Sequence, residues 1–211
     1  MNKGKIVIVA GGTCDLSLYR DILKDAYLIG ADRGALYLAD NGYKADLAAG
    51  DFDSVTKTGL DRIYENSFKV ETLPREKDET DLEYAVKHAL GIPGGTIHIL
   101  GATGTRLDQT FSALHLLKLI HDKGRTAFLY DSHNRIRLIE GKVSIKRDRY
   151  KYVSLIPYGD RPVKVSLKGF KYSGENIILK KISSMGVSNE ILEDEAEIES
   201  GECVFLFESE D

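Results

Sequence analysis

Short apolar runs alternate with segments of helical spacing along the first 130 residues. The run from Lys5 to Ala10 is continuous and β-branched, a pattern typical of a strand buried on both faces. Further strands are predicted at 26–30, 46–50, 67–72, 96–100 and 125–130, with helices between them at 16–24, 35–41, 56–66, 78–89 and 106–121. Strands that alternate with helices predict an α/β fold, with a mostly parallel sheet and helices on both faces.

The pattern changes after residue 130, where short β-rich runs mostly alternate apolar with polar residues. These runs cover 135–139, 143–146, 152–156, 163–167 and 203–207. Turns are predicted at Gly141-Lys142, at 158–160 and at Gly201. Because helical spacing is absent from this half, it is predicted to be an antiparallel β-sandwich or small barrel. The predicted domains are therefore residues 1–130 and 131–211.

Composition and charge exclude several functional classes. The formal net charge of −4 argues against a dedicated nucleic-acid binder, which usually has a basic excess. No apolar stretch reaches the length of a membrane span, and residues 1–4 lack the apolar segment of a signal peptide. Cys14 and Cys203 lie far apart without metal-ligand spacing, so both are expected to be reduced. We therefore expect a cytoplasmic protein that binds neither nucleic acid nor membranes.

The candidate chemistry centres on an acidic turn that follows the small-residue strand at 46–50. Asp51 and Asp53 are one residue apart, and in an extended or tightly turned backbone two such side chains point the same way. Two converging carboxylates suit Mg²⁺, which keeps several waters and completes its shell with substrate phosphates. The alternative is an ordinary solvated turn, since Asp and Ser are common turn residues.

Asp32 and Asp81 extend this acidic group. Asp32 follows the second predicted strand, and Asp81 lies one turn into the helix predicted to begin at Asp78. In parallel sheets, ligands bind beyond the carboxyl ends of the strands, so one crevice can collect these acids. If Asp51, Asp53 and Asp81 converge without counterions, these three carboxylates repel strongly, so their proximity would imply a bound metal.

Two predicted helix starts carry further polar groups. The glycine-rich turn at 101–104 precedes Arg106, and a helix N-terminus behind such a turn suits phosphate. Arg106 can pair with phosphate oxygens through its planar guanidinium. At the other helix start, Asp78 and Glu79 have a simpler explanation, because acids in a first turn cap the helix and offset its dipole.

Taken together, these segments resemble the thiamine pyrophosphokinase family over essentially the whole chain. The resemblance is carried by residues 30–35 (GADRGA), 46–54 (DLAAGDFDS), 77–82 (KDETDL), 101–110 (GATGTRLDQT) and 186–190 (GVSNE). It implies an α/β nucleotide-binding catalytic domain at 1–130 and a β-sandwich thiamine-binding domain at 131–211. It also implies the reaction ATP + thiamine → AMP + thiamine diphosphate, carried out by a homodimer with its active site between two subunits.

The resemblance implies a role for each matching residue. Asp51, Asp53 and Asp81 match the Mg²⁺-binding acids, and these three with Arg106 and Asp108 are the implied catalytic set. The positions implied to contact the nucleotide are Asp32, Lys77, Thr80, Gly101, Thr103, Gly104, Thr105 and Gln109. Ser188 and Asn189 match the thiamine-contacting stretch. The chain departs from commoner family forms at Arg33 and Thr105, where other members have Gly, which leaves the phosphate contacts open.

Two other functions remain open at this point. One is a pyrophosphokinase for another hydroxymethyl compound, such as a pterin, because its phosphate machinery would look alike. The other is a non-catalytic sensor of nucleotide or thiamine diphosphate, although a sensor has no need of a complete set of metal-binding acids. Outside the candidate site, His98 and His115 are expected to be structural, and residues 190–199 and 208–211 to be a solvated face and a frayed end.

Overall fold

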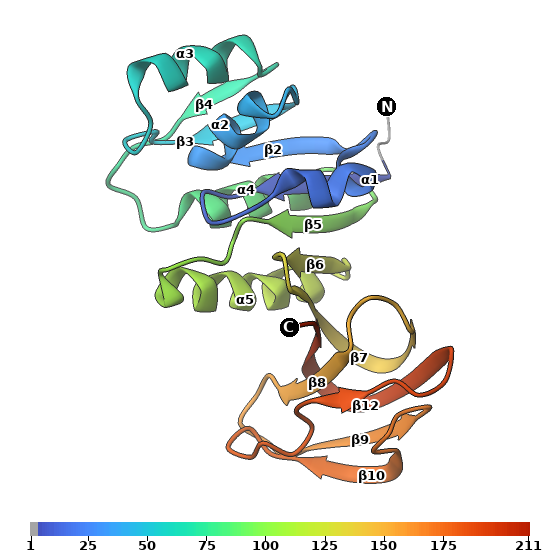
Figure 1. Ribbon diagram of the computed structural model, residues 1–211. Coiled ribbons are helices and arrows are strands. Elements are labelled where there is room, and N and C mark those ends of the chain that lie inside the picture. Colours follow the sequence, from blue (N-terminus) through green and yellow to red (C-terminus); the bar gives the residue numbers. More distant parts are fainter. Residues whose placement is uncertain (1–3) are drawn as a thin grey trace. The chain divides into compact units, whose positions relative to one another are not determined.

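The computed structural model describes residues 4–211 and divides them into two units, one ending at Ser132 and one running from His133 to Asp211 (Figure 1). The break lies close to the domain boundary predicted after residue 130. Each unit has its own hydrophobic core. None of the helices within residues 4–211 is both long enough and apolar enough to cross a membrane.

The first unit is built on a parallel sheet. Its strands lie in the order β6-β5-β1-β2-β3-β4, and every pairing between them is parallel. The continuous apolar runs of the sequence become these strands: β1 (Lys5–Val9), β2 (Tyr27–Ala31), β3 (Leu47–Gly50), β4 (Val70–Thr72), β5 (Thr96–Leu100) and β6 (Ala127–Tyr130). The central strands β1 and β3 are almost completely buried because helices cover both faces of the sheet.

The helices connect successive strands. They are α1 (Arg20–Leu23), which follows the 3₁₀ turn η1 (Leu16–Tyr19), then α2 (Arg33–Asp40), α3 (Lys57–Glu65), α4 (Asp81–Leu90) and α5 (Leu107–Asp122). Right-handed crossovers place α1, α2 and α3 on one face and α4 and α5 on the other, because the chain first moves from β1 toward β4 and then returns to β5 and β6 (Figure 1). The predicted fold class of this half is confirmed.

Two glycines bring α2 very close to the ends of β1 and β2. A Cβ at Gly34 would lie 1.8 Å from the carbonyl oxygen of Val9, and a Cβ at Gly30 would lie 2.3 Å from the Cα of Ala35. No side chain fits at either position, so only glycine permits this approach. The first residues of α2 are thereby fixed at the carboxyl edge of the sheet.

One predicted helix start was wrong. The sequence placed the N-cap of the fourth helix at Asp78, but α4 begins at Asp81, and Thr80 is its N-cap. The hydroxyl of Thr80 accepts a hydrogen bond of 3.1 Å from the backbone N–H of Glu83. Thr followed three residues later by Glu is the spacing of a capping box, and a threonine hydroxyl placed before the first turn caps the helix better than acids further upstream.

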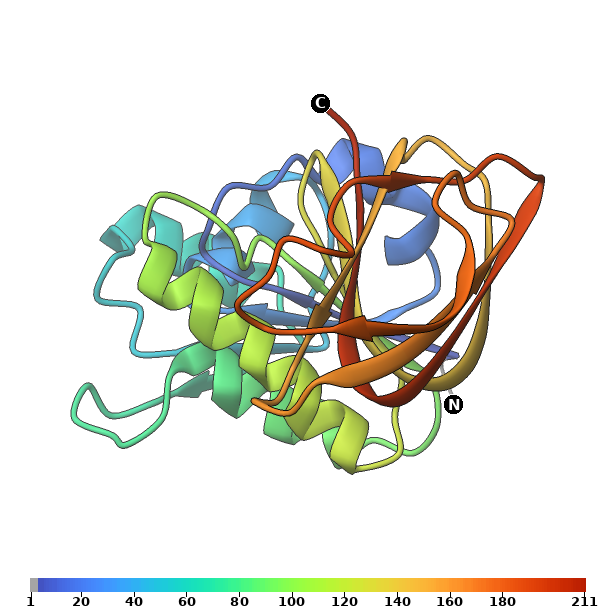
Figure 2. The same ribbon diagram turned by 90° about the horizontal axis from the view of Figure 1, so that it is seen from below.

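The second unit is antiparallel throughout. Its strands are β7 (Asn134–Lys146), β8 (Tyr152–Pro157), β9 (Val163–Lys168), β10 (Gly174–Leu179), β11 (Asn189–Glu190) and β12 (Glu195–Ser209). The long strand β12 pairs with β7 along both of its halves, with β9 through its first half and with β8 through its second half. Figure 2 shows the strands curving around one interior. This architecture confirms the β-rich antiparallel domain predicted for the second half.

The predicted turns at Gly141 and Gly201 were wrong. At both places the strand continues: Gly141 lies within β7 with φ +74°, and the β7–β12 register shifts between Ser200 and Val204. Glycine and a bulge bend a strand without reversing it, so β7 spans two of the predicted short runs and β12 extends well beyond the predicted run at 203–207.

The alternating pattern of the second half is realised as one buried and one exposed face. Along β9, Val163, Val165 and Leu167 point into the core, while Lys164 and Lys168 are exposed. The predicted frayed end at 208–211 was wrong at its first residue, because Glu208 is 2% exposed and pairs with Arg135. A buried acid is retained when a partly buried guanidinium neutralises it.

Candidate active site

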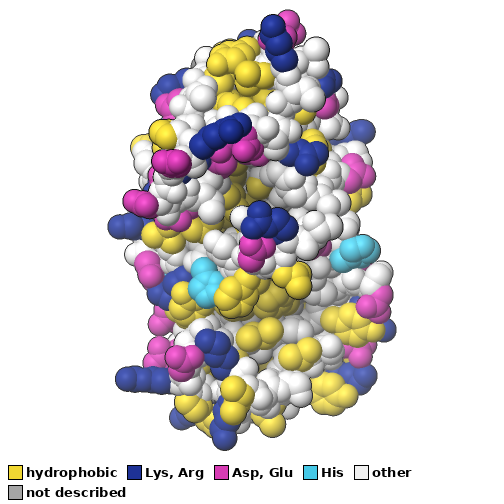
Figure 3. Space-filling view, turned by 90° about the vertical axis from the view of Figure 1, so that its left-hand side faces the viewer, with side chains coloured by type: hydrophobic (Ala, Val, Ile, Leu, Met, Phe, Trp, Pro, Cys, Tyr) yellow, Lys and Arg dark blue, Asp and Glu magenta, His cyan; other side chains and the backbone are white. Residues whose placement is uncertain are grey.

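A cleft of about 610 Å³ opens at the carboxyl edge of the first unit's sheet. The chain leaves β1 toward β2 but leaves β5 in the opposite direction, toward β6, so the loops that follow these two strands diverge. A crevice at such a point is where open α/β sheets bind ligands. Figure 3 faces this edge of the sheet, where acidic and basic side chains lie next to one another.

Two glycine-rich loops form one wall of the cleft. The backbone N–H of Gly12 donates to the carbonyl oxygen of Gly101 over 2.7 Å, and that of Thr13 donates to Thr103 over 3.1 Å. A Cβ at Gly12 would lie 2.2 Å from the carbonyl oxygen of Thr103, so the loops can approach this closely only through glycine. This wall is therefore mostly backbone, which lets a phosphate approach it closely.

Acids from three separate elements line the same cleft. Asp32 follows β2, Asp51 and Asp53 follow β3, and Asp81 is the first residue of α4. Burial raises the pKa of the Asp81 carboxyl, Lys77 opposes this shift, and the negative charges of Asp32 and Asp51 add to it. The carboxylates of Asp32 and Asp51 are therefore close enough to Asp81 to raise its pKa, although the three residues come from distant parts of the sequence.

Only one of the two carboxylate oxygens of Asp32 accepts a hydrogen bond. Ser54 donates a hydrogen bond of 2.9 Å to Asp32 Oδ2, while Oδ1 is buried and has no hydrogen-bond partner. The backbone of Asp32 adopts φ +48°, which is uncommon for a residue other than glycine. A buried carboxylate oxygen without a partner is costly unless a ligand satisfies it, so Asp32 belongs to an incomplete site.

Four cationic side chains also line the cleft: Arg33, Arg75, Lys77 and Arg106. Arg75 Nη2 lies 3.9 Å from Asp53 Oδ2, and Lys77 Nζ lies 2.9 Å from Asp81 Oδ1. The Lys77 contact is an ion pair without hydrogen-bond alignment, because Asp81 Oδ1 has no hydrogen-bond partner. The cations therefore neutralise the acids only in part.

Arg106 and Asp108 form a local pair at the start of α5. Arg106 Nε donates to Asp108 Oδ1 over 3.2 Å, and its Nη2 donates to Oδ2 over 2.6 Å. These hydrogen bonds lower the pKa of the Asp108 carboxyl. Both side chains are well exposed, so the pair presents a fixed guanidinium at the helix N-terminus but adds little stability.

The donor set fits a hard divalent cation. It offers carboxylate oxygens from Asp32, Asp51, Asp53 and Asp81, of which two buried oxygens lack hydrogen bonds. Mg²⁺ prefers oxygen ligands, needs only one or two protein carboxylates, and completes its shell with water and phosphate. The residues present are therefore suited to Mg²⁺ together with a phosphorylated substrate.

Most of the predicted nucleotide positions lie in this cleft. The lining includes Asp32, Lys77, Thr80, Gly101, Gly104, Thr105 and Gln109. Thr103 does not line it and instead holds the loop from behind through its carbonyl oxygen. Asp108 does not line it either and contacts the cleft only through Arg106. Sequence reasoning did not select Arg33, Arg75 or Glu79 as site residues, although Arg33 directly follows a strand end, the position that placed Asp32 in the set.

The two predicted thiamine-contacting residues belong to the second unit. Ser188 has φ +59°, and its backbone N–H donates to Ser154 Oγ over 3.0 Å. Asn189 is buried, and its side-chain amide both accepts from the backbone N–H of Tyr172 and donates to the carbonyl oxygen of Tyr172, each over 3.0 Å. Asn189 therefore ties β11 to the turn between β9 and β10, and its role in binding stays a prediction.

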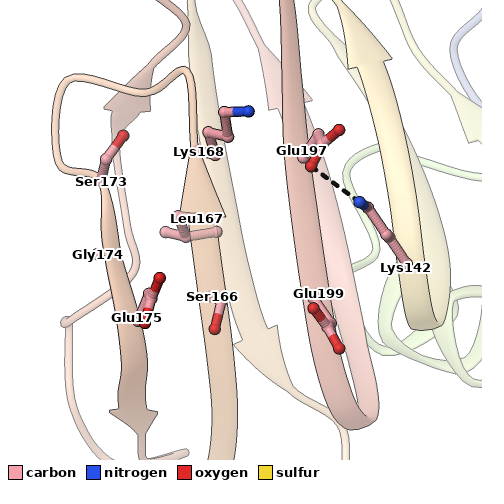
Figure 4. A pocket seen from close by; sticks show the side chains of 9 residues that line it. All are labelled: Lys142, Ser166, Leu167, Lys168, Ser173, Gly174, Glu175, Glu197 and Glu199. Carbon is pink, nitrogen blue, oxygen red and sulfur yellow. Dashed lines mark ion pairs between the residues drawn. The ribbon is translucent and has the colours of Figure 1, made fainter.

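The second unit carries a hollow of its own, of about 340 Å³, on the outer face of β9, β10 and β12 (Figure 4). Lys142 lies 3.0 Å from Glu197 there, and hydrogen bonding to Lys142 lowers the pKa of the Glu197 carboxyl. Most of the groups that line it are polar side chains on the outer face of the sheet, among them Lys142, Lys168 and Glu199. Neutralised charges on an open sheet face are typical of a solvated surface, so we do not regard this hollow as a candidate site.

Comparisons with known proteins identify relatives of the whole chain. The family model for the thiamin pyrophosphokinase catalytic domain matches residues 19–129, and that for the thiamin pyrophosphokinase vitamin B1 binding domain matches residues 141–204. A thiamine pyrophosphokinase of Bacillus subtilis (strain 168) is 34% identical over 193 residues, which cover 89% of each chain.

Solved structures agree with the sequence comparison. The crystal structure of thiamine pyrophosphokinase from Bacillus subtilis matches with a TM-score of 0.90 at 31% identity, covering 98% of this chain and 99% of the other. That of thiamin pyrophosphokinase from Geobacillus thermodenitrificans matches with a TM-score of 0.87 at 31% identity, covering 98% and 97%. The similarity therefore extends over both units.

Proposed function

Because the chain belongs to the thiamine pyrophosphokinase family, we infer that its substrates are ATP and thiamine and its products AMP and thiamine diphosphate. The observation that carries this inference is the cleft, where acids from three elements face one another beside two glycine-rich loops. Such a site suits a metal-bound triphosphate and little else. Neither a pterin pyrophosphokinase nor a sensor is supported by the comparisons.

We propose that Asp51, Asp53 and Asp81 hold Mg²⁺, with Asp32 as a further acid of the same site. When bound, the metal would neutralise charge on the triphosphate and orient it for displacement. Two buried oxygens without hydrogen bonds support this assignment: Asp32 Oδ1, and Asp81 Oδ1, whose one close cation is Lys77 at 2.9 Å. A metal ion would satisfy both. Lys77 and Arg75 would then be released from Asp81 and Asp53 and become available to phosphate oxygens.

The residues of the cleft have distinct proposed tasks in the displacement. The thiamine hydroxyl oxygen attacks the β-phosphorus, and the bond from that phosphorus to the oxygen bridging to the α-phosphate breaks. AMP leaves with the electron pair, and the hydroxyl proton is released to solvent. The glycine-rich loops at 10–12 and 101–105 would bind the phosphates through their backbone. Arg106 would clamp phosphate oxygens with its planar guanidinium, which Asp108 orients.

Thiamine recognition, assembly and location complete the proposal. Ser188 and Asn189 are proposed to lie in the thiamine-contacting stretch, and the enzyme is proposed to be a homodimer whose active site lies between two subunits. Light scattering after gel filtration tests the dimer. Kinetics of Ser188→Ala test the thiamine contact, since this variant should have a raised KM for thiamine and an unchanged KM for ATP. We also propose a cytoplasmic location, in keeping with two cysteines that form no disulfide.

The experiment that tests the proposed function is product analysis after mixing the enzyme with ATP, Mg²⁺ and thiamine. Equal amounts of AMP and thiamine diphosphate are expected, and ADP is not. AMP formed with a hydroxymethyl pterin but not with thiamine would favour the alternative kinase. A protein that binds nucleotide but forms AMP with neither alcohol would be a sensor, and the proposed function would be wrong.

A further inference from the structure

The four cations that line the cleft are not equivalent. Arg75, Lys77 and Arg106 each lie within 4 Å of a carboxylate, at 3.9, 2.9 and 2.6 Å respectively. Arg33 forms no ion pair with any carboxylate in the described part of the chain, residues 4–211, although it lines the same cleft. In a site rich in acids, a guanidinium without a carboxylate partner is the cation most available to an incoming anion.

Arg33 is held by an aromatic ring. Its guanidinium carbon lies 5.7 Å from the centroid of the Tyr37 ring, one helical turn further along α2. The hydroxyl of Tyr37 in turn lies 3.5 Å from the carbonyl oxygen of Gly11, a long contact toward the loop after β1. Stacking on a ring orients a guanidinium while leaving its N–H donors free, which an ion pair with a carboxylate does not.

Arg33 directly follows Asp32, but its side chain begins on the side of the cleft away from Asp51 and Asp53. A Cβ on Gly11 would lie 3.2 Å from the Cβ of Arg33, so the side chain begins against the glycine-rich wall. Asp51 and Asp53 follow β3, on the other side of β2. Arg33 is also the first residue of α2, where free backbone N–H groups and the helix dipole favour an anion.

We propose that Arg33 is a phosphate-binding residue of the nucleotide site that contacts the phosphate of the AMP moiety, the part of ATP that leaves. This assignment rests on the proposed function and adds to it a residue that stabilises the leaving group. Arg75 and Lys77 must give up a carboxylate before they bind phosphate, whereas Arg33 binds without any exchange of partners. Tyr37 acts as a positioning residue for Arg33.

The test is the affinity for AMP without Mg²⁺, measured by isothermal titration calorimetry with wild type, Arg33→Gln and Arg62→Gln. Arg62 is the matched control, because it is an exposed arginine paired with Asp40 at 2.7 Å and does not line the cleft. Arg33→Gln should weaken AMP binding by about tenfold or more, the usual size for losing a charge-assisted hydrogen bond. Arg62→Gln should bind AMP like wild type.

Two further variants separate positioning from folding. Tyr37→Leu should weaken AMP binding less than Arg33→Gln does, and Tyr37→Phe should restore most of the affinity because the ring is kept. Circular dichroism checks that each variant is folded, as expected for the exposed Arg33. Arg33→Gln within twofold of wild type, or an equal loss in Arg62→Gln, would overturn the proposal.

The same measurements keep this inference distinct from the proposed function. A wild-type enzyme that makes no AMP from ATP and thiamine would contradict the function, while calorimetry with AMP would still report on Arg33. An active enzyme whose Arg33→Gln variant binds AMP normally would contradict only the inference about Arg33.

Discussion

The carboxylate cluster around Arg135 in the second unit has enough counterions, whereas the acids of the cleft in the first unit do not. Arg135 donates to Glu208 through Nε at 2.8 Å and through Nη2 at 2.6 Å, and it also lies 2.8 Å from Asp148. In the first unit, Asp32 and Asp81 each keep a buried oxygen without a hydrogen bond. A paired buried acid is part of the architecture, whereas an unpaired one is the mark of a binding site.

The pKa shifts express the same contrast. Burial alone would lower the pKa of Arg135, but Glu208 and Asp148 raise it well above its ordinary value, so the charged pair is retained. Burial raises the pKa of Asp81, and the neighbouring carboxylates of Asp32 and Asp51 raise it further. One cluster stabilises its own charges, and the other needs a cation from outside.

The largest expected effect follows from removing one acid of the unpaired group. Asp51→Asn should lower the rate of AMP formation by about a hundredfold or more, since metal and electrostatic stabilisation of phosphoryl transfer contribute several kcal/mol. It should also reduce the rise in melting temperature that Mg²⁺ produces in wild type. Glu199→Gln, a change on the exposed outer face of β12, is the control and should leave both measurements unchanged. A fully active Asp51→Asn enzyme would contradict the metal assignment.

The second expected effect concerns the paired cluster. Glu208→Gln should lower the free energy of unfolding by about 3 kcal/mol, because it leaves Arg135 buried with a weaker partner. Urea unfolding measures this change. The activity per folded molecule should stay near that of wild type, since Glu208 is assigned no part in the chemistry. A loss of activity without a loss of stability would show that the two clusters are not as different as we infer.

The third effect is a pH dependence that comes from neither cluster. His98 is buried in β5 between Phe128 and Tyr130, and burial lowers its pKa from 6.5 to about 4. Between these values the unfolded chain binds the proton more readily, so stability falls as the pH falls from about 6.5 toward 4. The loss between pH 7 and pH 5 should be about 2 kcal/mol from this residue.

The His98 effect is isolated by a variant. His98→Phe keeps the stacking but cannot titrate, so its free energy of unfolding should fall less steeply over the same pH range than that of wild type. Chemical unfolding at several pH values measures the difference between the two slopes. Parallel slopes would show that folding does not lower the pKa of His98.

The smallest effect expected is a gain in stability. Asp81→Asn removes a charge that burial and two neighbouring acids disfavour, so without Mg²⁺ the variant should be more stable than wild type by less than about 1 kcal/mol, since solvent screens a half-buried group. The gain belongs to neutral pH, where wild-type Asp81 is ionised, and should vanish as the pH falls through the raised pKa toward 3.8. Thermal unfolding with and without Mg²⁺ tests it, and a less stable variant would contradict the repulsion.

The sequence predicted the strand ends well, and with them the acids of the cleft. Continuous apolar runs gave the strands of the first unit, so Asp32 and Asp51 were correctly placed directly after them. Because the carboxyl ends of parallel strands meet at one edge of a sheet, their convergence could be expected from sequence as well. The resemblance to the thiamine pyrophosphokinase family is confirmed by the comparisons.

What the sequence did not predict depends on contacts between distant residues. The pairing of Glu208 with Arg135 joins residues 73 positions apart, and nothing local distinguishes Glu208 from an acid in a frayed tail. In the sequence, Gly141 and Gly201 look like turn residues. In the structure the strand continues at both positions, because the long pairing of β7 with β12 makes a continued strand more stable than a reversal. Similarly, only the structure shows that Arg33 lies over the Tyr37 ring and forms no ion pair with a carboxylate of residues 4–211.

The central position of β12 has a consequence for how the protein is made. This strand is the last along the chain, yet it pairs with β7, β8 and β9. During translation the first unit can fold while the remainder is still being synthesised, but the second unit must wait until residue 209 has left the ribosome. Until then β7, β8 and β9 expose unpaired edges, so this half of the nascent chain is the part most in need of a chaperone.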